Sequence, residues 1–296
     1  MSFSADIKEE LSKISNLANK DLVKWELVGY LMTNNVYVKN GKIKYTTENK
    51  YNINRFAKLI SNMGINNYNI DIQGKIFSII VNEKIKMQEI STDNDKILVN
   101  YNNANLETES KASAEQIEKA IIRGNFLGSG SINNPENKYH LEVIYNSSEN
   151  LAIAEYILNK YNVQIKQLNT SLYIKDGEQI SNFLAFIGAS NAVLKFEEIR
   201  VIRDMRNNVN RLVNCETANL NKTIDAAIKQ IEDIKLIKKK KKFGELSDNL
   251  QEIANLRLEN PEISLVELGK MLKNPVGKSG VNYRLKAISK FANELR

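Results

Sequence analysis

The sequence predicts an α+β protein in which a helix-strand-strand-helix-strand-strand-helix unit occurs twice and an all-α domain follows. The first observation is that the order of elements expected in residues 1–92 recurs about 95 residues later, in residues 113–205. A duplication of this length implies two similar subdomains related by a pseudo-twofold axis. The second observation is that residues 246–296 contain helical apolar spacing and turn signals but no strand pattern. We therefore divide the chain into a duplicated domain (1–205), a linker with a lead helix (206–245) and a helical domain (246–296).

Composition excludes several classes of protein. The 296 residues are 42% hydrophobic and 26% charged, which is ordinary for globular domains and excludes disorder throughout. No apolar run approaches the roughly 20 residues that cross a bilayer, and residues 1–20 lack a signal-peptide core. The only cysteine and the only histidine, Cys215 and His140, exclude a disulfide and a thiolate zinc site. We expect a cytoplasmic protein with no membrane contact, no metal site and no cofactor.

The first repeat begins with an apolar stripe from Phe3 to Ile14, which predicts a helix capped by Ser4. A second helix is expected over Trp25–Asn35. The elements that follow are strands over Val36–Val38 and Lys42–Thr46, a helix over 54–62, strands over Tyr68–Ile72 and Ile76–Val81, and a helix over Glu83–Ile90. The polar stretch Ser91–Lys111 is expected to connect the two repeats.

The second repeat begins with a helix over Ala114–Leu127, where Ser113 and Gln116 have the spacing of a capping box. The elements expected after it are strands over Ser131–Ile132 and Tyr139–Tyr145, a helix over Leu151–Tyr161, strands over Val163–Leu168 and Ser171–Ile174, and a helix over Gln179–Ile187.

Small residues recur in the opening helix of each repeat. Ala120, Gly124 and Gly128 are four residues apart, and Gly29 and Thr33 form a similar pair. A glycine inside a helix costs about 1 kcal/mol relative to alanine, so these glycines need an offsetting interaction. Small residues at every fourth position let two helix backbones approach closely. We therefore expect the two opening helices to pack against each other.

Positive charge is concentrated in the last third of the chain. Of the net charge of +7, residues 210–296 carry +6 and residues 1–209 carry +1. A basic domain attached to a neutral one favours a polyanionic partner, most often nucleic acid. The alternative is a compositional bias, because 33 of the 42 basic residues are lysines. The run Lys238–Lys242 admits two interpretations, a solvated hinge, which we favour, or a phosphate contact.

The helical part predicts a helix-turn-helix over about 264–296. After helices over Ile224–Ile237 and Leu246–Leu258, Ser264 and Glu267 form a second capping-box pattern. The chain breaks at 273–277 and a basic helix starts near Ser279. That helix would enter the major groove of double-stranded DNA, although a three-helix cap with a solvated polar face has the same pattern. The candidate DNA-binding residues are Lys278, Ser279, Asn282, Arg284, Lys286 and Lys290.

Two segments resemble a known motif. The segment Ile122–Gly130 is similar to a degenerate LAGLIDADG motif, and Leu27–Asn35 is similar to a weaker second copy. The resemblance implies two helices packed at the subdomain interface, each ending in an acidic ligand of the catalytic metal. Here those positions are Asn34 and Ser129. Because neither is a carboxylate, they cannot hold Mg²⁺ as cleavage requires, and we expect no catalytic residues and no enzyme activity.

The whole chain resembles the WhiA family of DNA-binding regulators. Similar segments include Asn210–Asn219, and the most specific similarities are Ser264-Leu265 with Glu267-Leu268-Gly269 and the run Asn274–Asn282. The resemblance implies a noncatalytic LAGLIDADG domain tethered to a helix-turn-helix. It also implies roles in transcription control, cell division, chromosome segregation and sporulation, at the nucleoid. The alternative is an interaction scaffold whose inert endonuclease-like domain binds a protein partner, with DNA contact secondary.

Overall fold

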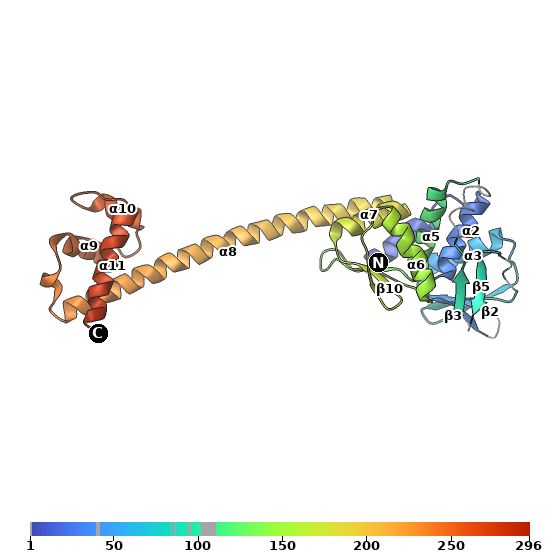
Figure 1. Cartoon of the computed structure of the whole chain (residues 1–296), viewed down its shortest axis with the longest axis horizontal. Coiled ribbons are helices and arrows are strands. Elements are labelled where there is room, and N and C mark those ends of the chain that lie inside the picture. The colour runs from blue at the N-terminus through green and yellow to red at the C-terminus, as the bar shows by residue number, and fades with distance from the viewer. Residues whose placement is uncertain (1, 40–41, 84, 86, 94–95, 102–110) are drawn as a thin grey trace. The chain divides into compact units, whose positions relative to one another are not determined.

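The computed structural model describes residues 2–39, 42–83, 85, 87–93, 96–101 and 111–296, which form two compact units, Met1–Asp204 and Met205–Arg296 (Figure 1). The N-terminal unit mixes helices and sheets, and the described part of the C-terminal unit is helical. The predicted α+β class is confirmed.

Within the described residues, the N-terminal unit contains two four-stranded antiparallel sheets with equivalent strand orders, β1-β2-β4-β3 and β7-β8-β10-β9. The matching orders are what a duplication with pseudo-twofold symmetry requires. The strands of the first sheet are β1 (Val36–Lys39), β2 (Lys42–Thr47), β3 (Tyr68–Gln73) and β4 (Ile76–Val81). Those of the second are β7 (Ser131–Ile132), β8 (Leu141–Ile144), β9 (Lys166–Leu168) and β10 (Ser171–Ile174).

In both halves a helix, two strands, a second helix and two further strands follow one another; the first half has an extra helix before this series, and the second half has one after it. The helices of the first half are α1 (Phe3–Ser12), α2 (Lys20–Leu31) and α3 (Lys50–Asn62). Those of the second are α5 (Ala114–Ser129), α6 (Ser148–Lys160) and α7 (Gly177–Ile187). Side chains that alternate along β2 and β4 are buried beneath these helices. The ring of Tyr45 on β2 lies 5.4 Å from Tyr30 on α2 and 4.7 Å from Phe56 on α3, so the core forms where the helices cover the sheet.

The two opening helices, α2 and α5, touch at their glycines. A Cβ atom at Gly29 would lie 2.2 Å from the carbonyl oxygen of Ile121, and one at Gly124 would lie 2.2 Å from that of Glu26. Further along, a Cβ at Gly128 would lie 2.5 Å from Oγ1 of Thr33. The close approach predicted from the small residues is confirmed.

Two sequence predictions in the first half are wrong. Ser2, and not Ser4, caps α1, because Phe3 is already helical and the Ser2 hydroxyl accepts a hydrogen bond from the amide of Ala5. The helix expected over Glu83–Ile90 is absent from the described residues there, and Ile90 instead begins a hairpin of β5 (Ile90–Asp93) and β6 (Lys96–Val99). This hairpin occupies part of the expected connector 91–111, of which residues 94–95 and 102–110 lie outside the described residues.

A side chain of the second repeat explains the hairpin. Asn150 on α6 is buried, and its amide nitrogen donates to the carbonyl of Ile97 at 2.7 Å. Its amide oxygen accepts from the backbone amide of Val99 at 3.1 Å. The backbone groups of β6 are therefore satisfied by a residue about 50 positions away, which a local pattern cannot reveal.

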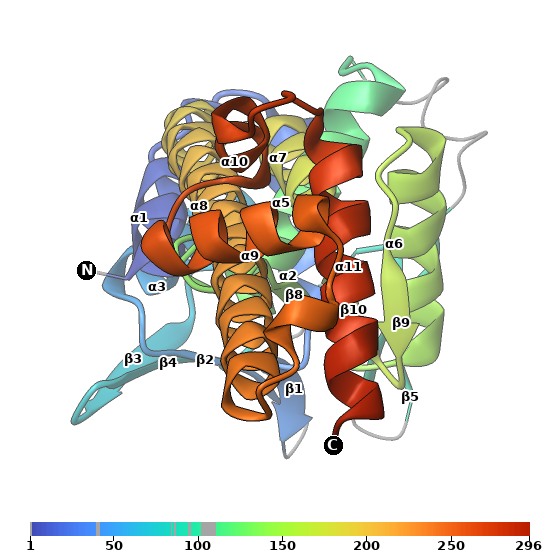
Figure 2. The same ribbon diagram turned by 90° about the vertical axis from the view of Figure 1, so that its left-hand side faces the viewer.

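The C-terminal unit begins within a long helix, α8 (Ser190–Lys239), which is one continuous element (Figure 1). The helix expected to lead this unit, over Ile224–Ile237, is thus the last part of a helix that starts much earlier. A single turn of 3₁₀ helix (Phe243–Glu245) leads to α9 (Asp248–Glu259), α10 (Leu265–Met271) and α11 (Lys278–Glu294). These three helices gather around the last turns of α8 (Figure 2). In the part of the chain that the structure describes, no helix is long and apolar enough to cross a membrane.

Candidate nucleic-acid interface

The start of α10 and the turn between α10 and α11 are built from local signals. Ser264 and Glu267 form the predicted capping box: the Ser264 hydroxyl accepts from the amide of Glu267 at 3.3 Å, and the carboxylate accepts from the amide of Ser264 at 2.9 Å. At the other end of α10, the amide of Val276 donates to the carbonyl of Gly269 at 3.1 Å. A Cβ at Gly269 would lie 2.1 Å from the carbonyl oxygen of Val276. Only glycine therefore lets the chain turn back this closely.

A small core holds α11 in place. Its residues Val281, Leu285, Ile288 and Ala292 are buried, as the apolar spacing predicts. They pack with apolar residues of the other helices, namely Ile234, Ile237, Leu246, Ile253, Ala254, Leu268 and Leu272. The opposite face of α11 is left to solvent.

Arg257 fixes the loop that precedes α10. Its side chain is 2% exposed, and its guanidinium donates to the carbonyl oxygens of Pro261 at 3.3 Å and Ile263 at 2.9 Å. Burial lowers the pKa of this group from its usual value, and the carbonyl partners hold the guanidinium in place. A buried arginine thus serves the loop and is not available to DNA.

Four of the six candidate DNA-binding residues share one face of α11. Ser279, Asn282, Lys286 and Lys290 follow one another at intervals of three and four residues, which is one side of a helix. Asn282 is half-buried, and the other three are exposed. This face lies opposite the buried stripe. The structure therefore brings these four side chains together on an accessible surface.

The other two candidates lie elsewhere. Lys278 is the exposed first residue of α11. Arg284 is half-buried and follows Asn282 by two positions, which is about 200° around the helix. It therefore borders the buried side of α11 and lies apart from the face that carries Asn282.

Sequence reasoning missed Tyr283. Its side chain is 76% exposed, and it lies one helical step from Asn282 on the polar side of α11. The sequence did contain a signal for it, because Tyr283 is an aromatic residue that does not fall on the apolar spacing of α11 and is therefore expected to be exposed. An exposed tyrosine there can contact a thymine methyl group or donate to a phosphate.

Electrostatics favour an anion at this surface. Between Glu267 and Glu294 the sequence holds six basic residues and no acidic one. Five of the six are exposed lysines, namely Lys270, Lys273, Lys278, Lys286 and Lys290. Exposed lysines without neighbouring acidic residues attract the phosphates of a nucleic acid.

The positions that correspond to metal ligands in the N-terminal unit hold neutral residues that contact the backbone of Ile144. Ser129, the last residue of α5, donates its hydroxyl to the carbonyl of Ile144 at 2.7 Å and accepts from the amide of Ile144 at 3.1 Å. Asn34 follows α2, and its backbone amide donates to the same carbonyl at 3.2 Å. Among the residues that the structure describes, no three histidines, cysteines or carboxylates are grouped to hold a metal ion. The hydroxyl of Ser129 thus joins α5 to β8.

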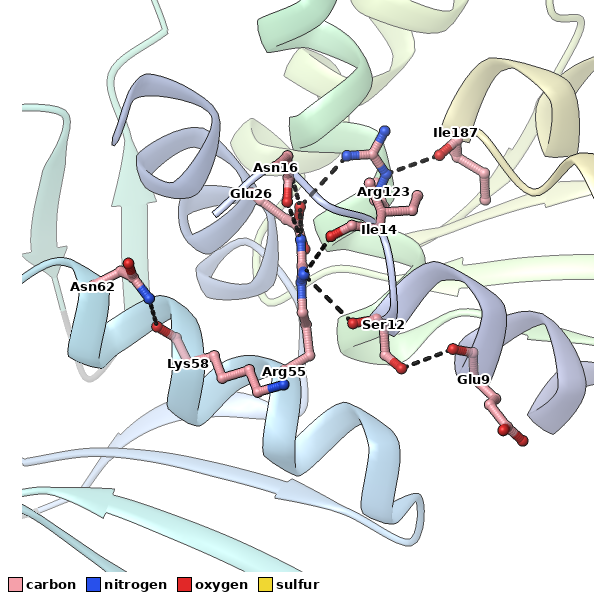
Figure 3. A network of polar contacts seen from close by, with 10 residues as sticks. All are labelled: Glu9, Ser12, Ile14, Asn16, Glu26, Arg55, Lys58, Asn62, Arg123 and Ile187. Atoms are coloured by element: carbon pink, nitrogen blue, oxygen red, sulfur yellow. Dashed lines mark hydrogen bonds and ion pairs between the residues drawn. The ribbon is translucent and has the colours of Figure 1, made fainter. Parts of the chain in front are cut away.

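The nearby carboxylate of Glu26 is buried in an ion-pair network (Figure 3). Arg55 on α3 donates to both of its oxygens, at 2.7 and 2.9 Å, and Arg123 on α5 approaches it at 3.5 Å. Arg55 also donates to the carbonyl of Ile14 at 2.9 Å, and Arg123 donates to the carbonyl of Ile187 at 2.8 Å. The network ties α2, α3 and α5 to the segment between α1 and α2 and to the last residue of α7, so Glu26 stabilises the packing of these elements.

The second buried carboxylate, Glu118 on α5, is also fully engaged. Its oxygens accept hydrogen bonds from Lys160 at 2.9 and 3.0 Å, Tyr101 at 2.7 Å and Tyr161 at 2.5 Å. Burial and the hydrogen bond to the carboxylate raise the pKa of Tyr101 well above its usual value. The phenol therefore stays protonated and donates to Glu118.

Comparisons with known proteins agree with this geometry. The family model described as the WhiA LAGLIDADG-like domain matches residues 118–206, and that of the WhiA C-terminal HTH domain matches residues 209–292. A protein of Clostridium tetani, "Probable cell division protein WhiA", is 38% identical over 318 residues, covering 100% of this chain and 98% of that protein. A relative of the same name from Clostridium beijerinckii is also 38% identical, with 100% and 99% covered.

A solved structure is similar over the full length. The full-length DUF199/WhiA from Thermatoga maritima matches with a TM-score of 0.56 and 27% identity, covering 99% of both chains. Together with the two curated relatives and the two domain matches, this similarity shows that the chain belongs to the WhiA family.

Proposed function

We propose that this chain is a sequence-specific DNA-binding regulator of transcription, cell division and chromosome segregation, without nuclease activity, that acts in the cytoplasm at the nucleoid. Sporulation control belongs to the same proposal for those family members whose cells sporulate. The observation that carries it is the α10–turn–α11 arrangement, with an accessible face of Ser279, Asn282, Lys286 and Lys290. The "cell division" in the printed names of the relatives supports the cellular role.

We assign DNA binding to the helix-turn-helix domain, 246–296, and treat 206–245 as its linker and lead helix. The charge distribution supports this division, because residues 210–296 carry +6 of the net charge of +7. The N-terminal domain, 1–205, carries neutral side chains at the positions of the nuclease's metal ligands, which supports a noncatalytic role.

Within α11 we assign different roles to two residues. Lys290 is exposed and flexible, so it reaches a phosphate as a point charge and carries no sequence information. Asn282 lies in the first turns of the helix, where its amide can both donate to and accept from adenine. Reading a base and contacting the backbone have different salt dependences, which makes the two roles separable.

The experiment compares binding of the full chain to a selected site and to random DNA over a range of salt concentrations. Asn282→Ala should cost about 1–3 kcal/mol on the selected site, little on random DNA, and leave the salt slope unchanged. Lys290→Ala should weaken both about equally and reduce the salt slope by roughly 0.9. Asn249→Ala, at an exposed asparagine of α9 in the same unit, is the matched control and should bind as the parent does.

Equal losses for Asn282→Ala on selected and random DNA would show that α11 positions the protein without reading sequence. The alternative function is an interaction scaffold whose N-terminal domain binds a protein partner. A scaffold of this kind need not bind DNA in a salt-dependent way. The same titrations with the intact chain therefore distinguish the two proposals.

A further inference from the structure

Lys8 on α1 carries a positive charge that is paired with no acidic group in the part of the chain that the structure describes. Its side chain is half-buried, and the ammonium nitrogen lies 5.9 Å from the centre of the Phe126 ring, which is fully buried. Burial lowers the pKa of Lys8 from its usual value to about 8. Because an unpaired charge away from water costs free energy, a lysine in this position needs a counter-charge.

The acidic groups of the same helix do not provide that counter-charge, because other groups bind them. Asp6 pairs with Lys195, Glu9 pairs with Lys13, and Glu10 accepts hydrogen bonds from two backbone amides at the start of α8. The two buried carboxylates of the N-terminal unit have the partners described above. The ammonium group on α1 therefore differs from its charged neighbours in having no partner within the described chain.

Lys8 lines an open cavity of about 490 Å³ between α1 and the end of β2. Ser4, one helical turn before Lys8, and Thr46 on β2 line the same cavity, and neither hydroxyl has a hydrogen-bond partner among the described residues. The residues that cap the N-termini of α1 and α3, Ser2 and Asn49, line it as well. Since a helix N-terminus carries partial positive charge, the cavity combines an ammonium group, two unpaired hydroxyls and two helix N-termini.

These groups fit an anion with several acceptor oxygens. One acidic residue, Glu48, also lines the cavity, but its side chain is exposed, so water and salt screen its charge. A carboxylate close to Lys8 would raise the pKa of the lysine, whereas burial alone causes the shift that is found. A phosphate group presents three acceptor oxygens and up to two negative charges, and a lysine binds it as a point charge. A carboxylate presents only two oxygens, so the donors of this cavity suit phosphate better.

We propose that this cavity binds the phosphate group of a small phosphorylated molecule, with Lys8 as the counter-charge of the phosphate. The hydroxyls of Ser4 and Thr46 donate hydrogen bonds to its oxygens. The cavity is larger than a phosphate ion requires, and the remaining space holds the organic part of a phosphate monoester. Phosphate binding is measured without DNA, so the proposal stands or falls independently of the proposed function.

The first experiment titrates the full chain with inorganic phosphate by isothermal titration calorimetry, at neutral pH and at an ionic strength held constant with sodium chloride. We expect the parent chain to bind phosphate and to bind acetate more weakly. Lys8→Met removes the charge and keeps the length of the side chain, and it should weaken phosphate binding by about tenfold or more. Ser4→Ala should weaken it by a smaller factor. Lys58→Met, at an exposed lysine of α3 outside the cavity, is the matched control and should bind phosphate as the parent does.

The second experiment measures the pKa of Lys8 from the pH dependence of its acetylation by acetic anhydride, read by mass spectrometry. Saturating phosphate should raise this pKa by about 1 or more, because a bound anion favours the charged ammonium. The affinity for phosphate should fall as the pH rises above about 8, where the free ammonium loses its proton. Lys8→Met should unfold at a temperature no lower than the parent, since methionine places no charge there. A lysine with a purely structural role would instead lose stability on this substitution.

DNA binding distinguishes the two possible sources of the phosphate group. If the cavity binds a small molecule, Lys8→Met binds DNA as the parent chain does. A loss of DNA affinity in Lys8→Met would show that the phosphate belongs to the DNA backbone, and it would overturn the proposal. The proposal would also be overturned if the parent bound no phosphate, if Lys8→Met and Ser4→Ala bound it as the parent does, or if acetate bound as tightly as phosphate.

Discussion

Replacing Gly29 by alanine tests whether the contact between α2 and α5 governs the stability of the N-terminal unit. The added Cβ would lie 2.2 Å from the carbonyl oxygen of Ile121 and 3.0 Å from the Cα of Gly124. An ordinary contact between carbon and oxygen is about 3.3 Å or longer, so the helices would have to separate by about 1 Å. Neither neighbouring atom belongs to a side chain that could rotate away.

The sign of the change in stability is the informative result. Helix propensity alone predicts that alanine stabilises the protein by about 1 kcal/mol. Overpacking a well-packed core costs about 1–3 kcal/mol, and sometimes more. Because the clash is between backbones, we expect the upper end of that range and a net loss of about 2 kcal/mol in the free energy of unfolding.

Denaturation in guanidinium chloride, followed by tryptophan fluorescence, measures this change. The only tryptophan, Trp25, lies on α2 and is 4% exposed, so its emission reports on the N-terminal unit. Gly244→Ala is the control, because a Cβ there meets nothing within 4 Å, and it should leave the Trp25 transition unchanged.

A second glycine in the same contact extends the test. Gly124→Ala should be as destabilising as Gly29→Ala, since its Cβ would lie 2.2 Å from the carbonyl oxygen of Glu26. The double variant should lose less than the sum of the two, because one separation of the helices relieves both clashes. Single variants that match or exceed the parent's stability would refute the argument that the close approach stabilises this unit.

The remaining predictions concern chemistry, the division of DNA binding, and the buried ion pair. The purified protein should not cut DNA with Mg²⁺ or Mn²⁺, because Asn34 and Ser129 provide no carboxylate; metal-dependent scission lost on mutating an acidic residue of 20–140 would contradict this. A fragment 206–296 should fold and retain most of the DNA affinity, and comparable binding by fragment 1–205 at about 150 mM salt would show the assignment to be wrong. Glu26→Gln should destabilise the N-terminal unit by about 3–5 kcal/mol, because Arg55 would be left buried without its counter-charge, and thermal unfolding at neutral pH measures the loss.

Features encoded within a few neighbouring residues were predictable from the sequence. The capping boxes at Ser113 and Ser264 form as predicted, because every participating group lies within three residues of the cap. The glycines of α2 and α5 also predicted a close helix contact, because the cost of glycine inside a helix must be offset by a contact with another part of the protein. The buried side of α11 followed from its apolar spacing in the same way.

Features that depend on residues far apart in the chain were decided only by the tertiary structure. The β5–β6 hairpin replaces a predicted helix because Asn150 supplies hydrogen bonds to β6 from the other repeat. The ion pair of Glu26 with Arg55, 29 positions away, likewise depends on how α2 packs against α3. In the last part of α8, Ile224 and Ile228 are exposed whereas Ile234 and Ile237 are buried, a difference that apolar spacing alone does not reveal. Sequence determines which groups need a partner, and the fold determines which partner each receives.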